Sequence, residues 1–293
     1  MIEVVGKGNI SAKVLADSIS HDVRLTTLEL YYPRFIHAEF MTHRMFSRNA
    51  SSSRAIPVTR MMKQVTSNPA MPIHWGKNQP GMQARKELDY DEISECYDAW
   101  MTAAFEASRY TSVLYAIGAH KQIVNRITEP FQFIKVVCSA TEWDNFFALR
   151  LHEDAQPEIY ELARVMKEVM DNSQPKPLQR REYHLPYIAD EERADPMYNL
   201  SDLVKASVAR CARVSYNNHD GSACDVESDL NLHDLLLAHK HMSPFEHVAK
   251  PMPLNDPNFQ DMTGVTHRDI QGDSWSGNFR KFIQYRKLVE VRS

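Results

Sequence analysis

Apolar positions along the chain change between the spacing of a strand and the spacing of a helix. Residues 21–35 are rich in β-forming side chains, which predicts a strand or hairpin that ends at Pro33. Between residues 35 and 45 the apolar residues recur near helical spacing, so a helix is expected there. The run from Ser47 to Arg54 is polar and is expected to form a loop.

Helical patterns dominate the rest of the chain. Residues 64–90 are rich in proline and glycine and predict a long irregular connection before a helix over 91–120. A further helical segment is expected from Thr141, and a regular apolar stripe after Glu158 predicts a helix with one buried face. Pro157 is expected to kink or restart that helix.

The last third of the chain begins with a stretch that combines several prolines with many charges. Residues 172–200 therefore predict a linker or an extended crossing segment. Helices are expected from Leu203 and again around 230–241, and Ser243-Pro244-Phe245-Glu246 has the form of a capping box with proline at the first helical position. The pattern as a whole predicts a mixed α and β protein with more helix than strand.

Composition and charge narrow the class of protein. With 43% hydrophobic and 25% charged residues, the 293-residue chain is typical of a globular protein of about two domains by length. A net charge of −4 gives no overall positive field for a nucleic acid. The 4 cysteines lie far apart, which disfavours a disulfide framework or a zinc site. Without a leader-like start or a long apolar run, we expect a cytoplasmic protein with no membrane contact.

Familiar phosphate and metal motifs are incomplete in this sequence. Gly6-Lys7-Gly8 lacks the third glycine of a dinucleotide-binding loop, and no P-loop pattern occurs. His37-Ala38-Glu39 has the first half of a zinc deaminase signature, but the cysteine pair that should follow is missing. We therefore expect no metal, and we expect any phosphate to be bound by side chains.

The densest group of candidate chemical residues runs from Thr42 to Arg54, with three Arg, one His, one Asn and four Ser in thirteen residues. Guanidinium groups bind phosphate through two hydrogen bonds, and short hydroxyl side chains add donors without crowding it. This composition suits an anion. A solvated helix end followed by a serine-rich flexible loop explains the same composition.

The run 43–54 resembles the H-R-x-x-S-x-N-x-x-S-x-R signature of the flavin-dependent thymidylate synthase family, called ThyX, with all six fixed positions present. A second block is similar to the family's downstream motifs. It consists of Arg126, residues 139–150 (SATEWDNFFALR) and residues 155–159 (AQPEI).

A third block, Ala212-Arg213-Val214-Ser215-Tyr216 and 243–247 (SPFEH), resembles motifs with which the family begins, but here it comes last. The resemblance therefore implies a circular permutation, which is tolerated when the original ends lie close together at the surface. It implies a ThyX-like core over 1–171, a proline-rich linker over 172–202, and a segment over 203–293 that holds the family's first part and an unmatched tail. We expect one intertwined α+β domain with helices packed on an antiparallel sheet.

The resemblance also implies roles for individual residues. Those expected to contact the nucleotide are Glu39, Ser51, Ser52, Ser53, Arg54, Arg126 and Arg150, with Arg150 also the catalytic residue beside the pyrimidine. Those expected to contact FAD are Thr42, His43, Arg44, Ser139, Asn145, Ser215 and His247. The implied reaction is reductive methylation of dUMP with methylenetetrahydrofolate and NADPH as co-substrates, in a homotetramer.

Three positions depart from the family pattern: Thr42 stands for an arginine, Glu39 for a common glutamine and Ala50 for a frequent glutamate. A carboxylate beside a phosphate is repulsive, so Glu39 is expected to pair with a neighbouring Arg or another substrate group. Two alternatives to a thymidylate synthase follow. One is a pyrimidine nucleotide hydroxymethylase, and the other is a nucleotide-binding protein without catalysis.

Overall fold

A computed structural model describes residues 2–214, 225–254 and 263–290. Its main sheet has six strands in the order β1-β2-β3-β5-β4, with β6 paired to β2. The strands are β1 (Glu3–Val5), β2 (Ser11–Ser20), β3 (Val23–Pro33), β4 (Ser47–Ala50), β5 (Phe133–Ala140) and β6 (Lys176–Pro177). All pairs are antiparallel except β2 with β6. This confirms the α+β class.

The central strands are buried on both faces. In β5, Val136, Cys138 and Ala140 enter one hydrophobic cluster, whereas Val137 enters another on the opposite side. Because successive side chains of a strand point to opposite faces, the odd-numbered Ser139 lies on the same side as Val137. The sheet therefore separates two halves of the molecule.

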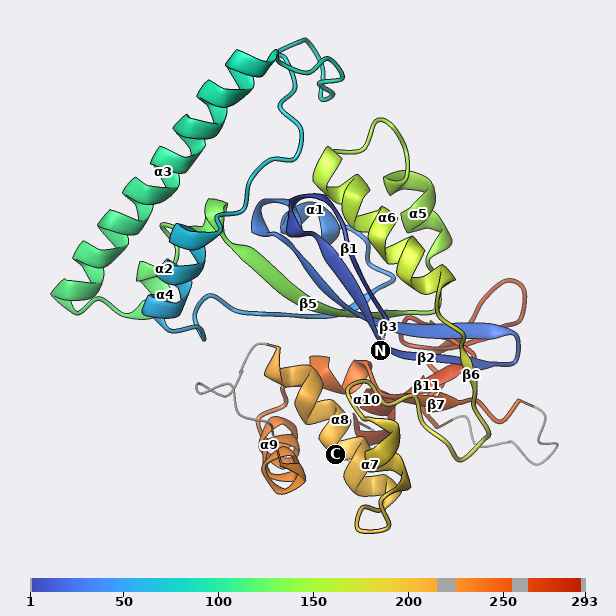
Figure 1. Cartoon of the computed structure of the whole chain (residues 1–293). Helices are drawn as coiled ribbons and strands as arrows, with labels where there is room; N and C mark the ends of the chain where they lie inside the picture. Colours follow the sequence, from blue (N-terminus) through green and yellow to red (C-terminus); the bar gives the residue numbers. More distant parts are fainter. Residues whose placement is uncertain (1, 215–224, 255–262, 291–293) are drawn as a thin grey trace.

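One face of the sheet is covered by α5 (Asp144–Arg150) and α6 (Pro157–Asp171), as Figure 1 shows. The apolar stripe expected after Glu158 is confirmed, since Ile159, Leu162 and Met166 are fully buried in the largest cluster. Pro157 occupies the first turn of α6, so it starts that helix and does not kink it.

The other face is covered by the C-terminal third of the chain (Figure 1). This part contains α7 (Asp190–Ala194), α8 (Leu200–Arg213), α9 (Val226–Ala238), the 3₁₀ helix η4 (Ser243–Glu246), β7 (Ala249–Pro251), β8 (His267–Arg268), β9 (Ser274–Ser276), β10 (Phe279–Arg280), β11 (Phe282–Gln284) and α10 (Tyr285–Glu290). Val23 and Leu25 of β3 pack against Phe279 and Phe282, so the described residues 263–290 contribute to the core.

A helical arm stands away from the sheet (Figure 1). It consists of α2 (Val58–Ser67), α3 (Tyr90–Ile117) and α4 (Lys121–Val124), with η3 (Glu129–Phe131) leading into β5. The predicted helix over 91–120 is confirmed: Asp89 and Glu92 form a capping box at its start, and Gly118 ends it in the left-handed region. Within the described residues, no helix is both long and apolar enough to cross a bilayer.

Three local expectations are wrong. The helix expected over 35–45 is limited to two short turns, η2 (Arg34–Ile36) and α1 (His37–Phe40). It extends no further because the Thr42 hydroxyl bonds the Glu39 carbonyl and the chain turns there. A separate 3₁₀ helix, η1 (Lys7–Asn9), comes earlier in the chain, between β1 and β2. The loop expected from Ser47 to Arg54 begins as strand β4, which pairs with β5. Ser243 lies inside η4, and no side chain caps that helix.

The segment 172–202 crosses between the halves as a packed element. Its Leu178, Leu185 and Ile188 are buried, and His184 is 1% exposed. It also holds β6 and α7, and α8 begins within it at Leu200. The sequence indicated an extended crossing segment, and its packing follows from apolar residues placed between the prolines and charges.

Candidate functional site

Three of the candidate residues form a compact group, the Arg150 cluster, made of Glu39, His43 and Arg150. Arg150 lies in the last turn of α5, where a cation is favoured by the helix dipole. Its Nε donates to His43 Nε2 at 2.9 Å, and its Nη1 forms an ion pair with Glu39. The side chains of Arg150 and Glu39 are 19% and 29% exposed, so the pair lies at the protein surface but partly shielded. Glu39 thus has the neighbouring Arg that its position required.

His43 is the buried member of this cluster. Its ring packs edge-on against Phe146 with centroids 4.8 Å apart. Burial, and then the nearby Arg150 and Arg48 charges, lower the pKa of His43 to about 4. The imidazole is therefore neutral at pH 7, and because Nε2 accepts from Arg150, its hydrogen is on Nδ1.

An exposed rim adjoins the Arg150 cluster. Thr42 and Arg44 follow α1, Asn145 lies in the first turn of α5, and all three side chains are exposed. Within the described residues, Arg44 forms no ion pair, so its guanidinium is available to a ligand.

A second group, the Glu129 cluster, consists of Arg34, Ser53, Arg126 and Glu129. The Glu129 carboxylate accepts from Ser53 Oγ at 3.0 Å and from Arg126 Nη1 at 3.0 Å, and Arg34 Nη2 lies 3.2 Å away. Burial lowers the pKa of Arg34, but a guanidinium stays charged at any physiological pH. One carboxylate here faces two guanidinium groups, which leaves the cluster positive.

The remaining serines and Arg54 border the Glu129 cluster. Ser51 Oγ accepts from the Lys135 amide at 3.1 Å, and Ser52 Oγ accepts from the Arg54 amide at 3.3 Å. Arg54 is exposed and forms no ion pair within the described residues. The loop therefore presents hydroxyl groups and one unpaired guanidinium, which suits a phosphate.

A third group lies on the opposite side of the sheet. Five buried side chains form a linear set of hydrogen bonds that we call the polar row: Ser18, His184, Thr27, Ser139 and His247. The successive distances are 2.8 Å from Ser18 Oγ to His184 Nδ1, 2.7 Å from His184 Nε2 to Thr27 Oγ1, 2.6 Å from Thr27 Oγ1 to Ser139 Oγ, and 2.8 Å from Ser139 Oγ to His247 Nδ1.

Both histidines of the polar row are neutral. Burial lowers the pKa of His184 and of His247 to about 3. His247 Nε2 is buried and has no hydrogen-bond partner within the described residues. An unpaired buried ring nitrogen is costly, so this atom is a candidate contact for a bound molecule.

The sequence-predicted residues are thus divided among three places. On the α5 side lie Glu39, Thr42, His43, Arg44, Asn145 and Arg150. Beyond β4 lie Ser51–Arg54 and Arg126. On the opposite face of the sheet lie the side chains of Ser139 and His247. Ser215 lies outside the described residues.

Sequence reasoning missed Arg34, Glu129, Ser18, Thr27 and His184, which complete the second and third groups. A single threonine in a strand or a single histidine in a proline-rich segment gives no local signal of such a contact.

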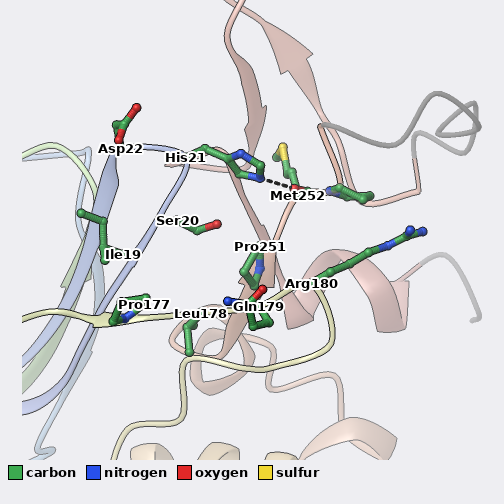
Figure 2. A pocket seen from close by; sticks show the side chains of 11 residues that line it. Ile19, Ser20, His21, Asp22, Pro177, Leu178, Gln179, Arg180, Pro251 and Met252 are labelled. Carbon is green, nitrogen blue, oxygen red and sulfur yellow. Dashed lines mark hydrogen bonds between the residues drawn. The ribbon is translucent and has the colours of Figure 1, made fainter.

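A pocket of about 730 Å³ lies elsewhere, between the β2–β3 turn, residues 177–180 and Pro251–Pro253 (Figure 2). His21 Nε2 is hydrogen-bonded to the Met252 carbonyl at its edge, at 2.7 Å. None of the sequence-predicted residues lines this pocket, so it does not mark the site of the motifs.

A comparison with known protein families agrees with the motifs. The family described as thymidylate synthase complementing protein matches residues 23–176, which is just over half of the chain. Two solved structures of a UMP/dUMP methylase, PolB from Streptomyces cacaoi, bound with 5-Br dUMP and 5-Br UMP, have TM-scores of 0.44 and 0.45 at 17% and 15% identity. They cover 51% and 57% of this chain and 67% and 90% of theirs. No curated protein matches.

Proposed function

The chain belongs to the thymidylate synthase complementing protein family, and on that premise we propose that it is a flavin-dependent thymidylate synthase that methylates dUMP to dTMP with methylenetetrahydrofolate and NADPH. The observation that carries the proposal is the Arg150 cluster. It holds a guanidinium in a fixed orientation at the end of α5, within residues that resemble the family's downstream motif.

Arg150 would act on the pyrimidine by electrostatics. A reaction at C5 of uracil requires negative charge to develop on the ring, and a fixed cation beside the ring stabilises that charge. His43 accepts from Arg150 Nε and Glu39 pairs with Nη1, so the guanidinium is oriented before substrate arrives. Because Arg150 remains protonated at any working pH, it transfers no proton.

Arg54, Ser52 and Arg126 would bind the phosphate. Arg54 is free of a carboxylate partner within the described residues, and Glu129 holds the Arg126 side chain in place.

The residues present fit a flavin at two points. The exposed rim of Thr42, Arg44 and Asn145 offers polar side chains to a ligand, and His247 Nε2 lacks a partner within the described part of the chain. These residues, with His43, would hold the cofactor, and Ser139 would act through its hydrogen bond to His247. Bound flavin would supply the hydride chemistry of the reaction.

The division of these residues among three places supports a homotetramer whose sites lie between copies. In such an assembly one copy presents its Arg150 cluster to the Glu129 cluster of another. Mixing an Arg150→Ala variant with an Arg54→Ala variant, after dissociation and reassembly, should then restore part of the activity that each lacks alone. No recovery at any mixing ratio would exclude composite sites.

Circular permutation is part of the same proposal, with residues 203–250 supplying the family's first segment. The packing of this segment on the sheet supports it. Asn49 Nδ2 donates to the Cys211 carbonyl at 3.4 Å, and His247 bonds Ser139. The match to the family ends at residue 176, before that segment begins.

A second reaction is favoured by Glu39. This carboxylate stands where glutamine is common and holds Arg150, which changes the hydrogen bonds available to the pyrimidine. The alternative is hydroxymethylation, in which water and not hydride completes the transfer of the one-carbon unit. Both reactions begin from the same nucleotide, so they are separated by the mass of the product.

The test is to purify the chain with FAD, add dUMP, methylenetetrahydrofolate and NADPH, and weigh the nucleotide. Formation of dTMP supports the synthase, and a hydroxymethyl product supports the alternative. Arg150→Ala should abolish turnover and leave flavin absorbance largely unchanged. Failure of the wild-type protein to bind FAD after reconstitution would overturn both reactions.

A further inference from the structure

The polar row joins residues that the family motifs do not connect. Ser139 and His247 belong to the motifs, whereas Ser18 and Thr27 come from β2 and β3, and His184 comes from the crossing segment 172–202. All five side chains are at most 4% exposed. The row therefore runs through the interior and ends at His247 Nε2, the atom that lacks a partner within the described residues.

The hydrogens of the row can be counted. Each hydroxyl group carries one polar hydrogen, and each neutral imidazole carries one. Both rings are neutral at pH 7, because burial keeps the pKa of each at about 3. The row therefore has five polar hydrogens and four hydrogen bonds, so one hydrogen takes part in none of these bonds.

The position of that spare hydrogen fixes the direction of every bond. If the bonds run from Ser18 toward His247, the spare hydrogen is on His247 Nε2. If they run the other way, the spare hydrogen is on Ser18 and His247 Nε2 is an unpaired acceptor, so both ends lack a partner within the described residues. A spare hydrogen on Thr27 or Ser139 would be buried without an acceptor, since the two recorded bonds of each hydroxyl are already used.

We propose that His184 is a positioning residue which, through Thr27 and Ser139, holds His247 as the tautomer with its hydrogen on Nε2. His247 then donates that hydrogen to an acceptor atom of the bound cofactor, such as a carbonyl oxygen or a ring nitrogen. In this arrangement every hydrogen of the row is used. The proposal rests on the proposed function for the identity of the cofactor, but the direction of the row is a property of the protein alone.

The first test needs no cofactor. Nitrogen-15 NMR of the full chain with labelled histidine distinguishes the two neutral tautomers, and His247→Gln identifies the His247 signals. At pH 7.5 the wild-type protein should show His247 with its hydrogen on Nε2. A hydrogen on Nδ1 in the wild-type protein would overturn the proposed direction.

Variants of His184 test its part in the row. His184→Leu removes both ring nitrogens at similar volume, and the Nδ1–H form should rise about fivefold, the factor that the net contribution of one hydrogen bond supports. His184→Gln keeps one donor and one acceptor and should resemble the wild-type protein. His21→Asn is the matched control, because His21 bonds Met252 outside the row and its left-handed backbone accepts asparagine. Unchanged His247 signals in His184→Leu would show that His184 does not position His247.

Cofactor binding gives the second readout. In a fluorescence titration, FAD affinity should fall about fivefold in His184→Leu and stay within about twofold in His184→Gln and His21→Asn. If the wild-type protein binds no FAD, the proposed function fails while the NMR result still decides the role of His184. If His184→Leu does not fold, Ser18→Ala removes the first donor of the row, and the same rise in the Nδ1–H form is expected.

Discussion

The burial of His184 makes the stability of this protein depend on pH in a way that one substitution can isolate. The folded-state pKa of His184 is about 3, against an ordinary value of 6.5, because burial disfavours the charged ring. Below pH 6.5 the unfolded chain binds a proton at this residue and the folded chain does not. The contribution of neutral His184 to the free energy of unfolding is therefore complete above pH 6.5 and is lost as the pH falls toward 3.

The size of the effect follows from those two pKa values. At pH 5 the unfolded chain gains about 2 kcal/mol from protonation of this one residue, and at pH 7.5 it gains almost nothing. In His184→Gln that contribution is absent. The difference in unfolding free energy between the wild-type protein and His184→Gln should therefore shift by about 2 kcal/mol in favour of the variant between pH 7.5 and pH 5.

Urea unfolding at the two pH values, followed by circular dichroism, measures this difference. All other titrating groups are shared by the two proteins, so their contributions cancel. His152→Gln is the matched control, because the His152 side chain is 57% exposed and water surrounds it in both states. A difference for His184→Gln that stays constant within about 0.5 kcal/mol would show that His184 is not held neutral in the folded protein.

Three further predictions concern backbone, buried charge and substrate. Gly277→Ala should cost about 2 to 3 kcal/mol in thermal unfolding, because φ is +60° and the new Cβ would lie 2.2 Å from Gln284 Oε1. The control Gly272→Ala should cost only about 1 kcal/mol, because φ is +86° there but no atom lies within 4 Å of the new Cβ. Asp229→Asn should cost about 3 kcal/mol, since this fully buried carboxylate pairs with Arg210 and Arg213, and the 62% exposed Asp234→Asn should cost under about 1 kcal/mol. Arg54→Ala should weaken dUMP binding about tenfold in calorimetry without changing deoxyuridine binding, and equal losses for both would contradict a phosphate contact.

Periodic segments could be predicted from the sequence. The stripe of α6 and the capped start of α3 depend on neighbours within one helix, so their pattern is visible locally. The same is true of β3, whose end at Pro33 is as expected. The motif residues themselves were also found from the sequence.

Strand β5 and the polar strand β4 could not be predicted in the same way. Residues 133–140 are buried on both faces, so they show no alternation, and a short apolar run alone does not distinguish a strand from a buried helix segment. In β4, Ser47 and Asn49 are buried because Asn278 and the Cys211 carbonyl bond them from far along the chain. The polar composition of residues 47–50 therefore indicated a loop.

The arrangement of the candidate site depends on contacts between distant residues. Arg150 and Glu39 are 111 positions apart, and His184 and Thr27 are 157 positions apart. A motif identifies such residues by type, but only the fold brings them together. The sequence therefore indicated candidate residues on the α5 side, and it could not show that Ser139 and His247 lie on the opposite face of the sheet.

The two-sided burial of the sheet has a practical consequence for recombinant work. A chain cut at residue 176, where the family match ends, would leave Leu15, Leu25 and Val137 facing water, because their partners come from later residues. An apolar surface of that kind promotes aggregation, so such a fragment should collect in inclusion bodies. Expression trials should therefore keep the whole polypeptide, since residues 1–176 alone would leave one face of the sheet without its apolar partners.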